Sequence, residues 1–318
     1  MITSVHFKYF RALRDVSMTL TPLTVLVGPN SSGKTSVLDA LNPQVNTSLP
    51  NFWQQKHNDS FLISWAYDNN ASGRILIANR TTVNSSRQIV TEKYVHAENP
   101  KHKTQTLTLD LKAVRSENIL AHAAQLSSTG DNLTNVFSSL TRNQQASVAH
   151  ELCRLVPMFS DVDLMPTTEG RHQLRFQDRW NPDLWLIPSQ VSDGTVLVLA
   201  FLVLQHQINP VDLITIEEPE RALHPYLLDE LIQLIRKMTT GEIGKKPIQF
   251  ILATHSAELL EYVRPEEVRF LTRSPEDGSV QVNVAPTEST NWQQVYKEYR
   301  ESLGSIWLSG NVGGVPGR

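Results

Sequence analysis

Short apolar stretches separated by polar turns occupy both ends of the chain and predict alternating strands and helices. Near the N-terminus, Val5 and Phe7 alternate with polar residues, as in a strand with one buried face. A compact apolar run at 24–27 is typical of a buried strand, and the residues after Thr35 have helical spacing. We therefore expect strand, turn, strand, loop and helix over residues 1–41.

A second block of the same kind spans about 185–273. Its expected elements are an apolar stretch at 195–204, strands at 213–216 and 248–253, and helices at 225–238 and 257–263. Because strands alternate with helices, the two blocks predict an α/β fold with a mostly parallel sheet that is covered by helices on both faces.

The residues between these blocks have a different pattern. Antiparallel strands are expected where short segments rich in β-formers are separated by turn residues, at 61–67, 73–83, 87–95 and 104–111. Helical spacing of apolar residues predicts helices at 116–126 and 131–156. The predicted domains are a discontinuous core at 1–41 and 185–273, an inserted β-rich lobe with a helical region at 42–184, and a C-terminal extension at 274–318 that contacts a partner or a second copy.

Charge and cysteine content limit the classes of function. The chain has 318 residues and a net charge of −3, so it has no overall positive field for nonspecific nucleic-acid binding. The single cysteine, Cys153, excludes a disulfide framework and a paired-cysteine zinc site. The longest apolar run, 196–204, is about half a membrane span, and charge occupies the N-terminal stretch where a signal peptide needs apolar residues. We expect a soluble, cytoplasmic protein without a membrane segment.

Residues 28–35 match the pattern G-x-x-x-x-G-K-[ST] between an apolar strand and a helix. The glycines permit a tight turn in which successive backbone N–H groups face phosphate oxygens. Lys34 is then expected to reach the β- and γ-phosphates of a nucleotide, and the Thr35 hydroxyl to bind Mg²⁺. The residues expected to contact the nucleotide are Gly28, Asn30, Ser31, Ser32, Gly33, Lys34, Thr35 and Ser36.

Two carboxylates, Glu217 and Glu218, end the apolar strand at 213–216. Ligands of parallel sheets bind at the carboxyl ends of the strands, so we expect Glu217 to hold the Mg²⁺ shell. Glu218 is the expected general base that polarises the attacking water. The alternative is an acidic helix cap, and the phosphate loop upstream favours the nucleotide site.

Two weaker signals accompany these motifs. His255 follows the strand at 248–253 and is a candidate for contacting the γ-phosphate, with a structural hydrogen bond as the alternative. Ser192 and Gly194 precede the apolar stretch at 195–204 and predict a second anion-binding helix N-terminus. An ordinary helix cap is the alternative for that pair.

In their order along the chain, these motifs resemble the ATP-binding-cassette (ABC) ATPases of the SMC/RecF/OLD group, which are P-loop NTPases. Residues 28–35 resemble the Walker A loop, 191–195 the cassette signature, and 213–218 the Walker B strand. The region at 219–225 resembles the D-loop, and His255 resembles the switch histidine. The resemblance also implies a Q-loop glutamine, for which Gln54 and Gln88 are the candidates.

The resemblance implies a head-to-tail homodimer, or a larger assembly, in which the signature of one protomer closes on ATP held by the Walker A loop of the other. Ser192 and Gly194 would act across that interface. ATP binding would close the dimer and hydrolysis would open it, as in a nucleotide-dependent switch.

Departures from the family pattern narrow the expected role. Glu217 stands where most cassettes carry aspartate, and the compact relatives carry the same glutamate. The signature Ser-Asp-Gly-Thr at 192–195 differs from that of transporters and so argues against a transporter subunit. No acidic DxD cluster follows His255, so we expect no nuclease activity of the chain itself. The glycine-rich tail at 308–316 resembles that of ATPases in two-gene bacterial systems, whose separately encoded effector is often Toprim-like.

The resemblance to two-gene systems implies an antiviral defence or stress-response switch. The alternative is an ATP-dependent DNA clamp of repair or recombination, for which a local basic patch would be needed. The candidate basic residues for such a patch are scattered along the chain, namely Lys101, Lys103, Arg171, Lys245 and Lys246.

Overall fold

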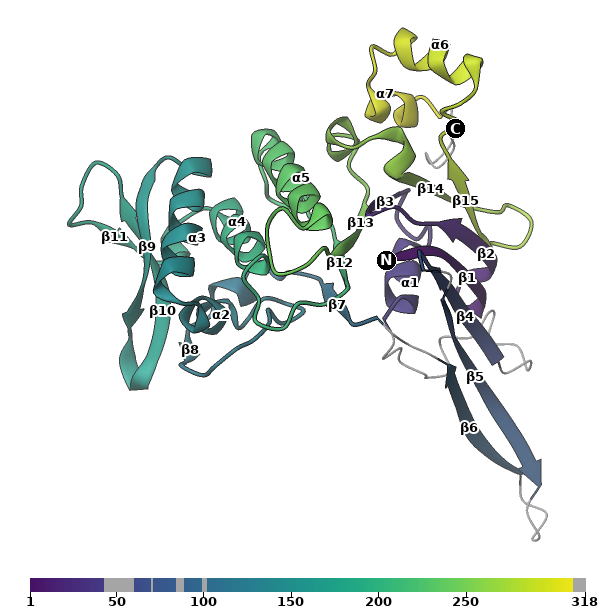
Figure 1. Cartoon of the computed structure of the whole chain (residues 1–318), viewed down its shortest axis with the longest axis horizontal. Helices are drawn as coiled ribbons and strands as arrows, with labels where there is room; N and C mark the ends of the chain where they lie inside the picture. The colour runs from purple at the N-terminus through teal and green to yellow at the C-terminus, as the bar shows by residue number, and fades with distance from the viewer. Residues whose placement is uncertain (43–59, 70, 84–88, 99–101, 311–318) are drawn as a thin grey trace. The chain divides into compact units, whose positions relative to one another are not determined.

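The chain forms two compact units. The computed structural model describes residues 1–42, 60–69, 71–83, 89–98 and 102–310, and gives the backbone alone over 77–83, 89–98 and at 169. The first unit comprises 1–106, 212–216 and 249–318, and the second comprises 107–211 and 217–248. Figure 1 shows the elements in chain order. The domain boundaries expected from the sequence stay a prediction.

An antiparallel sheet of five strands lies in the first unit, in the order β2-β1-β4-β5-β6. Its strands are β1 (Ile2–Phe10), β2 (Leu13–Thr19), β4 (Ser60–Tyr67), β5 (Ser72–Val83) and β6 (Ile89–Glu98). Polar and apolar residues alternate along β1 because its apolar side chains, among them Val5 and Phe7, face the core. The antiparallel strands predicted near 61–67, 73–83 and 87–95 are thereby confirmed.

The second sheet of this unit has six strands, in the order β15-β14-β3-β13-β12-β7. They are β3 (Leu23–Val27), β7 (Thr104–Leu107), β12 (Leu213–Glu217), β13 (Gln249–Thr254), β14 (Val268–Arg273) and β15 (Val280–Val284). β3 runs parallel to both β13 and β14, and every residue of β3 and β13 is buried, as in the central strands of a parallel sheet.

The segment at 104–111 is predicted from the sequence to form an antiparallel strand with the segments at 61–95. Its strand, β7, joins the six-stranded sheet beside β12 instead. The chain is tied to the start of β12 by a pair of polar contacts. The backbone N–H of Lys103 donates to the Asp212 carboxylate at 2.7 Å, and the N–H of Asp212 donates to the Lys103 carbonyl oxygen at 2.9 Å. β7 therefore extends the mostly parallel sheet at its edge.

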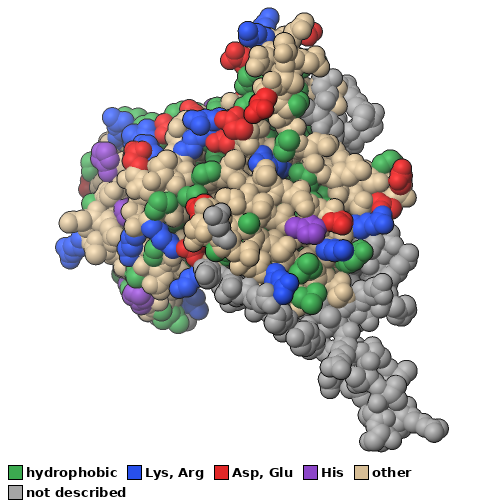
Figure 2. Space-filling model, turned by 45° about the vertical axis from the view of Figure 1, so that its right-hand side comes forward, with side chains coloured by type: hydrophobic (Ala, Val, Ile, Leu, Met, Phe, Trp, Pro, Cys, Tyr) green, Lys and Arg blue, Asp and Glu red, His purple; other side chains and the backbone are tan. Residues whose placement is uncertain are grey.

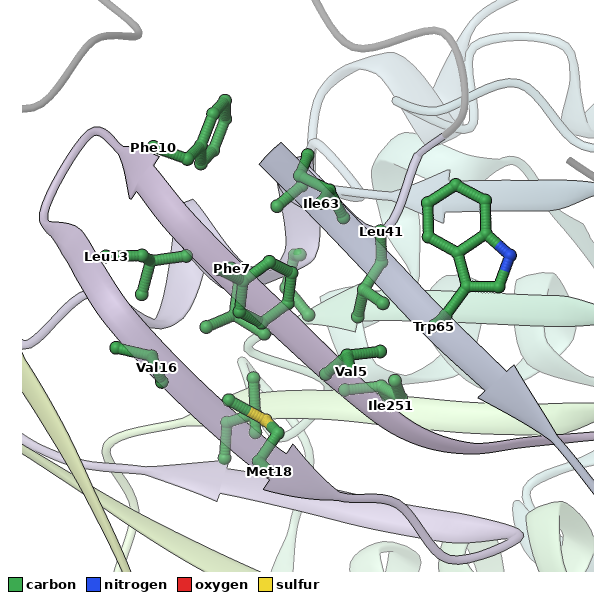
Figure 3. Close-up of a cluster of buried hydrophobic side chains, with 14 of the residues drawn as sticks. Val5, Phe7, Phe10, Leu13, Val16, Met18, Leu41, Ile63, Trp65 and Ile251 are labelled. Atoms are coloured by element: carbon green, nitrogen blue, oxygen red, sulfur yellow. The ribbon is translucent and has the colours of Figure 1, made fainter. Parts of the chain in front are cut away.

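The core of the first unit collects apolar side chains from both sheets and from α1 (Lys34–Ala40). Figure 3 shows part of it, with Phe7 of β1, Ile63 of β4 and Ile251 of β13 among the labelled residues. Val37 and Leu38 add the buried face of α1. Each fully buried side chain of this size contributes about 1.5–3 kcal/mol, so this packing holds α1 against the sheet.

Short helices complete the first unit, namely η6 (Leu259–Tyr262), η7 (Pro265–Glu267), α6 (Thr290–Glu298) and α7 (Leu303–Leu308). The helix expected at 257–263 is thus a single 3₁₀ segment. Arg264, at φ −86° and ψ 148°, is extended because the residue before a proline is driven out of the helical region. The carboxylate of Glu261 accepts from the N–H of Gly304 at 2.9 Å and so fastens α7 to η6.

The second unit packs helices on a small antiparallel sheet. Its strands are β8 (Asn118–Ile119), β9 (Phe159–Pro166), β10 (Arg171–Asp178) and β11 (Trp185–Leu186), with β10 paired to the other three. Its helices are α2 (Leu133–Ser139), α3 (Arg142–Leu155), α4 (Asp193–Leu204) and α5 (Pro225–Thr240), with the 3₁₀ segments η3 (Ala113–Arg115), η4 (Thr168–Gly170) and η5 (Pro188–Gln190).

The predicted helices of this region are partly wrong. The helix expected at 131–156 is two helices, α2 and α3. The Thr141 side chain caps the N-terminus of α3, so α3 begins as a new helix after α2 has ended. The segment 116–126 holds β8 and irregular backbone in place of a helix. Side chains bind its amides there: Asn135 accepts from Ala121 N–H at 3.2 Å, and similar contacts follow downstream. Those contacts replace the helical hydrogen bonds.

The apolar stretch at 195–204 lies within helix α4, which is buried along 194–204. A helix that is apolar on all sides is enclosed by protein, and α4 packs against α2, α3 and α5. By contrast, α5 buries one face only, through residues such as Leu231 and Ile235.

Candidate nucleotide-binding site

The phosphate loop connects β3 to α1 in a turn that leaves no space for side chains at its glycines. Gly33 has φ +107°, and a Cβ atom there would lie 2.5 Å from Cγ2 of Val280. A Cβ on Gly28 would lie 2.5 Å from the carbonyl oxygen of Leu271. Ser31 also has a positive φ, of 64°. Consecutive backbone amides in such a turn form a concave anion-binding surface.

Lys34 folds back over this loop. Its Nζ donates to the carbonyl oxygens of Gly28 at 2.7 Å and of Pro29 at 2.9 Å. Next to it, Ser32 is 1% exposed, and its hydroxyl has no hydrogen-bond partner among the described residues. A buried hydroxyl without a protein partner and a cation beside amide donors fit the oxygens of a phosphate chain.

The remaining loop residues differ in exposure. Asn30, Ser31 and Thr35 are exposed, and Ser36 is half-buried. Thr35 lies on the first turn of α1, and its hydroxyl is the kind of hard oxygen ligand that Mg²⁺ prefers. Within the described ranges, no group of three or more His, Cys, Asp or Glu residues could hold a metal ion.

The strands on either side of β3 bring further polar residues to the loop. β13 pairs with β3 so that Thr254 lies opposite Val27, and His255 therefore leaves the sheet beside the start of the loop. His255 is exposed. On the other side, Nε of Arg273, the last residue of β14, donates to the carbonyl oxygen of Ser31 at 2.7 Å. The motifs do not include Arg273, although a cation at the carboxyl end of an apolar segment is a usable signal.

Strand β12 starts beside β13, since the N–H of Gln249 donates to the Asp212 carbonyl oxygen at 3.0 Å. The two strands are neighbours in the sheet and begin together, so they run in the same direction. Glu217 is the last residue of β12, and Glu218 follows with φ +49°. Both are half-buried. A positive φ at a residue other than glycine is a strained conformation of the type found at functional sites.

Ser192 and Gly194 lie at the start of α4 in the second unit. The Ser192 hydroxyl accepts from the N–H of Thr195 at 3.2 Å and caps the helix. Ser192 is exposed, whereas Gly194 is buried, and a Cβ on Gly194 would lie 2.8 Å from the Ala222 carbonyl oxygen. The signature turn therefore requires glycine at 194 because the segment after Glu218 passes directly over it.

Arg115 is a second residue that the motifs did not identify. Its Nη2 donates to Oδ1 of Asp193 at 2.6 Å and to the carbonyl oxygen of Val191 at 3.1 Å. It precedes the signature by many residues in the chain, and no sequence pattern marked it. The Q-loop candidates, Gln54 and Gln88, lie outside the described residues, as does most of the glycine-rich tail.

Comparisons with known proteins identify the family of the chain. A family model described as "AAA domain, putative AbiEii toxin, Type IV TA system" matches residues 98–261, slightly more than half of the chain. A second, described as "AAA ATPase domain", matches residues 1–152. The chain belongs to the AAA ATPase family.

Solved structures place this AAA ATPase in a known fold. The SMC head domain of Thermotoga maritima has a TM-score of 0.51 and 14% identity, covering 89% of this chain and 98% of that one. An Smc head domain of Pyrococcus furiosus, with an extended coiled coil and bound to the C-terminal domain of ScpA, has a TM-score of 0.57 and 12% identity. That match covers 94% of this chain and 99% of the other. The predicted α/β fold of ABC ATPase type is confirmed.

A curated relative supports the same group. The OLD nuclease of Thermus scotoductus is 45% identical over 42 residues, which are 13% of this chain and only 8% of that protein. The AAA ATPase is thus an SMC/RecF/OLD-like ABC-type ATPase, as the motifs indicated. None of its described helices is both long and apolar enough to cross a membrane.

Proposed function

We propose that the protein binds ATP with Mg²⁺ and hydrolyses it to ADP and phosphate. The observation that carries this proposal is the phosphate loop, where two glycines leave no space for side chains and the Lys34 ammonium lies 2.7 Å from a loop carbonyl oxygen. The buried Ser32 hydroxyl adds an oxygen without a protein partner among the described residues. Together these groups suit a triphosphate.

Each predicted site residue has a role in this proposal. The loop amides, with Asn30, Ser31 and Lys34, hold the phosphates, and Ser36 supports them from α1. Thr35 and Glu217 contribute oxygens to the Mg²⁺ shell, which neutralises phosphate charge. Glu218 accepts a proton from the attacking water while His255 donates a hydrogen bond to the γ-phosphate.

We further propose that two protomers share each site in a head-to-tail homodimer. Ser192 supports this proposal because it is exposed at the N-terminus of α4, where a second copy can bring its nucleotide. ATP binding then closes the dimer, and hydrolysis opens it. This cycle is the two-state element of a switch in the bacterial cytoplasm.

The switch controls a separately encoded effector of the Toprim nuclease type in an anti-phage defence system. This part of the proposal is supported by the toxin–antitoxin description of the matching family and by the similarity to an OLD nuclease. It also rests on the resemblance of the glycine-rich tail to that of ATPases in two-gene systems.

Turnover per protomer, measured with Mg²⁺ over a range of protein concentrations, tests the shared site. We expect a rate that rises with concentration and saturates as the dimer forms. A constant rate in a protein that remains monomeric by mass would contradict the shared site. Strong stimulation by DNA that falls steeply with salt would favour a DNA clamp in place of the effector switch.

A mixing experiment tests the geometry of the dimer. Lys34→Ala removes one Walker A loop, and Ser192→Arg blocks one signature, so each variant alone should be inactive. In a mixed dimer, one of the two sites keeps an intact loop and an intact signature, and activity should return to about one quarter of the wild-type rate. Failure of the mixture to recover would contradict the head-to-tail arrangement.

A further inference from the structure

Arg115 joins two residues on either side of Ser192. A single nitrogen, Nη2, donates to the Val191 carbonyl oxygen at 3.1 Å and to the Asp193 carboxylate at 2.6 Å. Ser192 therefore lies in a short turn whose preceding and following residues are held by the same guanidinium. Since 82% of the Arg115 side chain is buried, this ion pair is less screened than one on an open surface.

The short helix η3, which ends at Arg115, is held by hydrogen bonds and by a buried side chain. The carboxylate of Asp110 accepts from the backbone N–H groups of Lys112 at 2.9 Å and Ala113 at 2.7 Å, at the start of η3. Val114 is 2% exposed, so its side chain anchors η3 in the core of the second unit. The guanidinium is thus carried on a fixed turn and not on a mobile loop.

The signature turn has constraints at its two ends, because Val191 is buried and a later backbone segment passes over Gly194, but the residues between them are exposed. The hydroxyl of Ser192 caps α4 through Thr195, which fixes the helix end but not the residues before it. Asp193 is nearly half exposed, and Ser192 is exposed. Without the guanidinium, Val191 would lose a hydrogen bond and Asp193 its ion pair, so the exposed residues 192 and 193 would be held less firmly.

We propose that Arg115 is a positioning residue for the signature, which holds residues 191–193 so that Ser192 meets ATP bound by a second copy of the chain. This inference rests on the proposed function and adds the residue that fixes its geometry. Arg115 itself need not touch the nucleotide. Nη2 carries two N–H groups, so this one nitrogen can donate to the carbonyl oxygen and to the carboxylate together.

Three variants separate positioning from a general loss of stability. Arg115→Gln removes the cation, Arg115→Lys restores the charge alone, and Arg175→Gln is the matched control. Arg175 forms an ion pair of the same length with Asp163, at 2.6 Å, in the same unit, and its guanidinium lies over the ring of Trp185 and contacts no signature residue among the described ones. Melting temperature, ATP affinity and turnover are measured for each.

We expect Arg115→Gln to lower kcat about 10- to 100-fold, because displacement of a reacting group by about 1 Å has an effect of that size. ATP affinity should remain near wild type, since the Walker A loop is intact. Arg115→Lys should recover part of kcat, and Arg175→Gln should keep it. Equal kcat losses in Arg115→Gln and Arg175→Gln, or a wild-type kcat in Arg115→Gln, would overturn the proposal.

Mixing the variants then shows on which protomer Arg115 acts. If Arg115 acts through the signature, Lys34→Ala mixed with Arg115→Gln regains as much activity as Lys34→Ala mixed with Ser192→Arg. If only the Ser192→Arg mixture recovers, Arg115 serves its own Walker A site and the inference is wrong. If the Ser192→Arg mixture also stays inactive, the head-to-tail site of the proposed function fails first. The two failures are therefore distinguishable.

Discussion

The imidazole of His102 lies with Nε2 3.3 Å from the carbonyl oxygen of Leu41, the residue that ends helix α1. A carbonyl oxygen can only accept, so Nε2 carries the proton and Nδ1 accepts from the Tyr67 hydroxyl at 2.8 Å. Burial lowers the pKa of His102, and the Leu41 carbonyl and the Asp212 charge oppose this to a smaller extent. A neutral histidine thus fastens one end of the helix whose other end carries Lys34.

The first prediction concerns pH. Since the pKa of His102 is lower in the folded chain than its usual 6.5, the unfolded chain binds the proton more readily. The free energy of unfolding should therefore fall as pH drops from about 6.5 towards the lowered pKa, and level off below it. Urea denaturation at several pH values measures this, and His102→Gln, whose amide can still donate to Leu41, should reduce the slope.

The matched control for that prediction is His150→Gln, which changes an exposed histidine of the second unit. An unchanged slope in His102→Gln, or the same reduction in both variants, would show that His102 is not the group responsible.

The second prediction concerns Gly33. A side chain there must adopt φ +107° and would meet Cγ2 of Val280 at 2.5 Å. Gly33→Ala should destabilise the protein by about 1–3 kcal/mol and weaken ATP binding, because both the backbone conformation and the contact are unfavourable. Chemical denaturation and ATP titration measure the two effects.

A double variant separates the two causes of the stability loss in Gly33→Ala, the backbone conformation and the contact with Val280. Val280→Ala removes the atom in the way but leaves the positive φ. In the Gly33→Ala background it should therefore recover part of the stability and not all of it. Full recovery would mean that backbone strain at Gly33 contributes nothing.

The third prediction concerns Lys34. Lys34→Ala removes the ammonium that charge-assisted hydrogen bonds would join to the phosphates, and ATP affinity should fall by about 10- to 150-fold. Calorimetry or a fluorescent ATP analogue gives the affinity. Lys112→Ala, at an exposed lysine of the second unit, is the control and should bind ATP as the wild type does. Unchanged affinity in Lys34→Ala would defeat the phosphate-loop assignment.

The fourth prediction concerns Glu218. Its replacement by glutamine keeps the size of the side chain but removes the base, so ATP should bind while turnover falls by about 100-fold or more. ATP should then hold the dimer closed, which size-exclusion chromatography with light scattering detects. Glu242→Gln changes an exposed carboxylate and should behave as the wild type. Wild-type turnover in Glu218→Gln would assign the base to another residue.

The sequence predicted those parts of the fold whose pattern is local. The buried strands at 24–27 and 248–253 needed only a run of apolar residues, and the structure has β3 and β13 there. The segment 116–126 was predicted wrongly because its backbone amides bind side chains from distant residues such as Gln207, which no local pattern contains. Tertiary contacts decided the conformation in that segment.

The candidate site divides in the same way. Gly28, Gly33 and Lys34 form one contiguous motif, so sequence spacing alone marks them. Arg115 became visible only through its contact with Val191. Arg273 ends an apolar segment, but its contact with Ser31, far away in the chain, became visible only in the structure. Folding brings such pairs together, and a single sequence carries no periodic signal for either partner.

Helix α4 has a mechanical consequence. Its residues 194–204 are enclosed on all sides, so the helix cannot slide or rotate without opening the core of the second unit. A displacement of Ser192 should consequently move α4 together with α2, α3 and α5, against which it packs. The second unit should therefore respond to an event at the signature by moving as one rigid body.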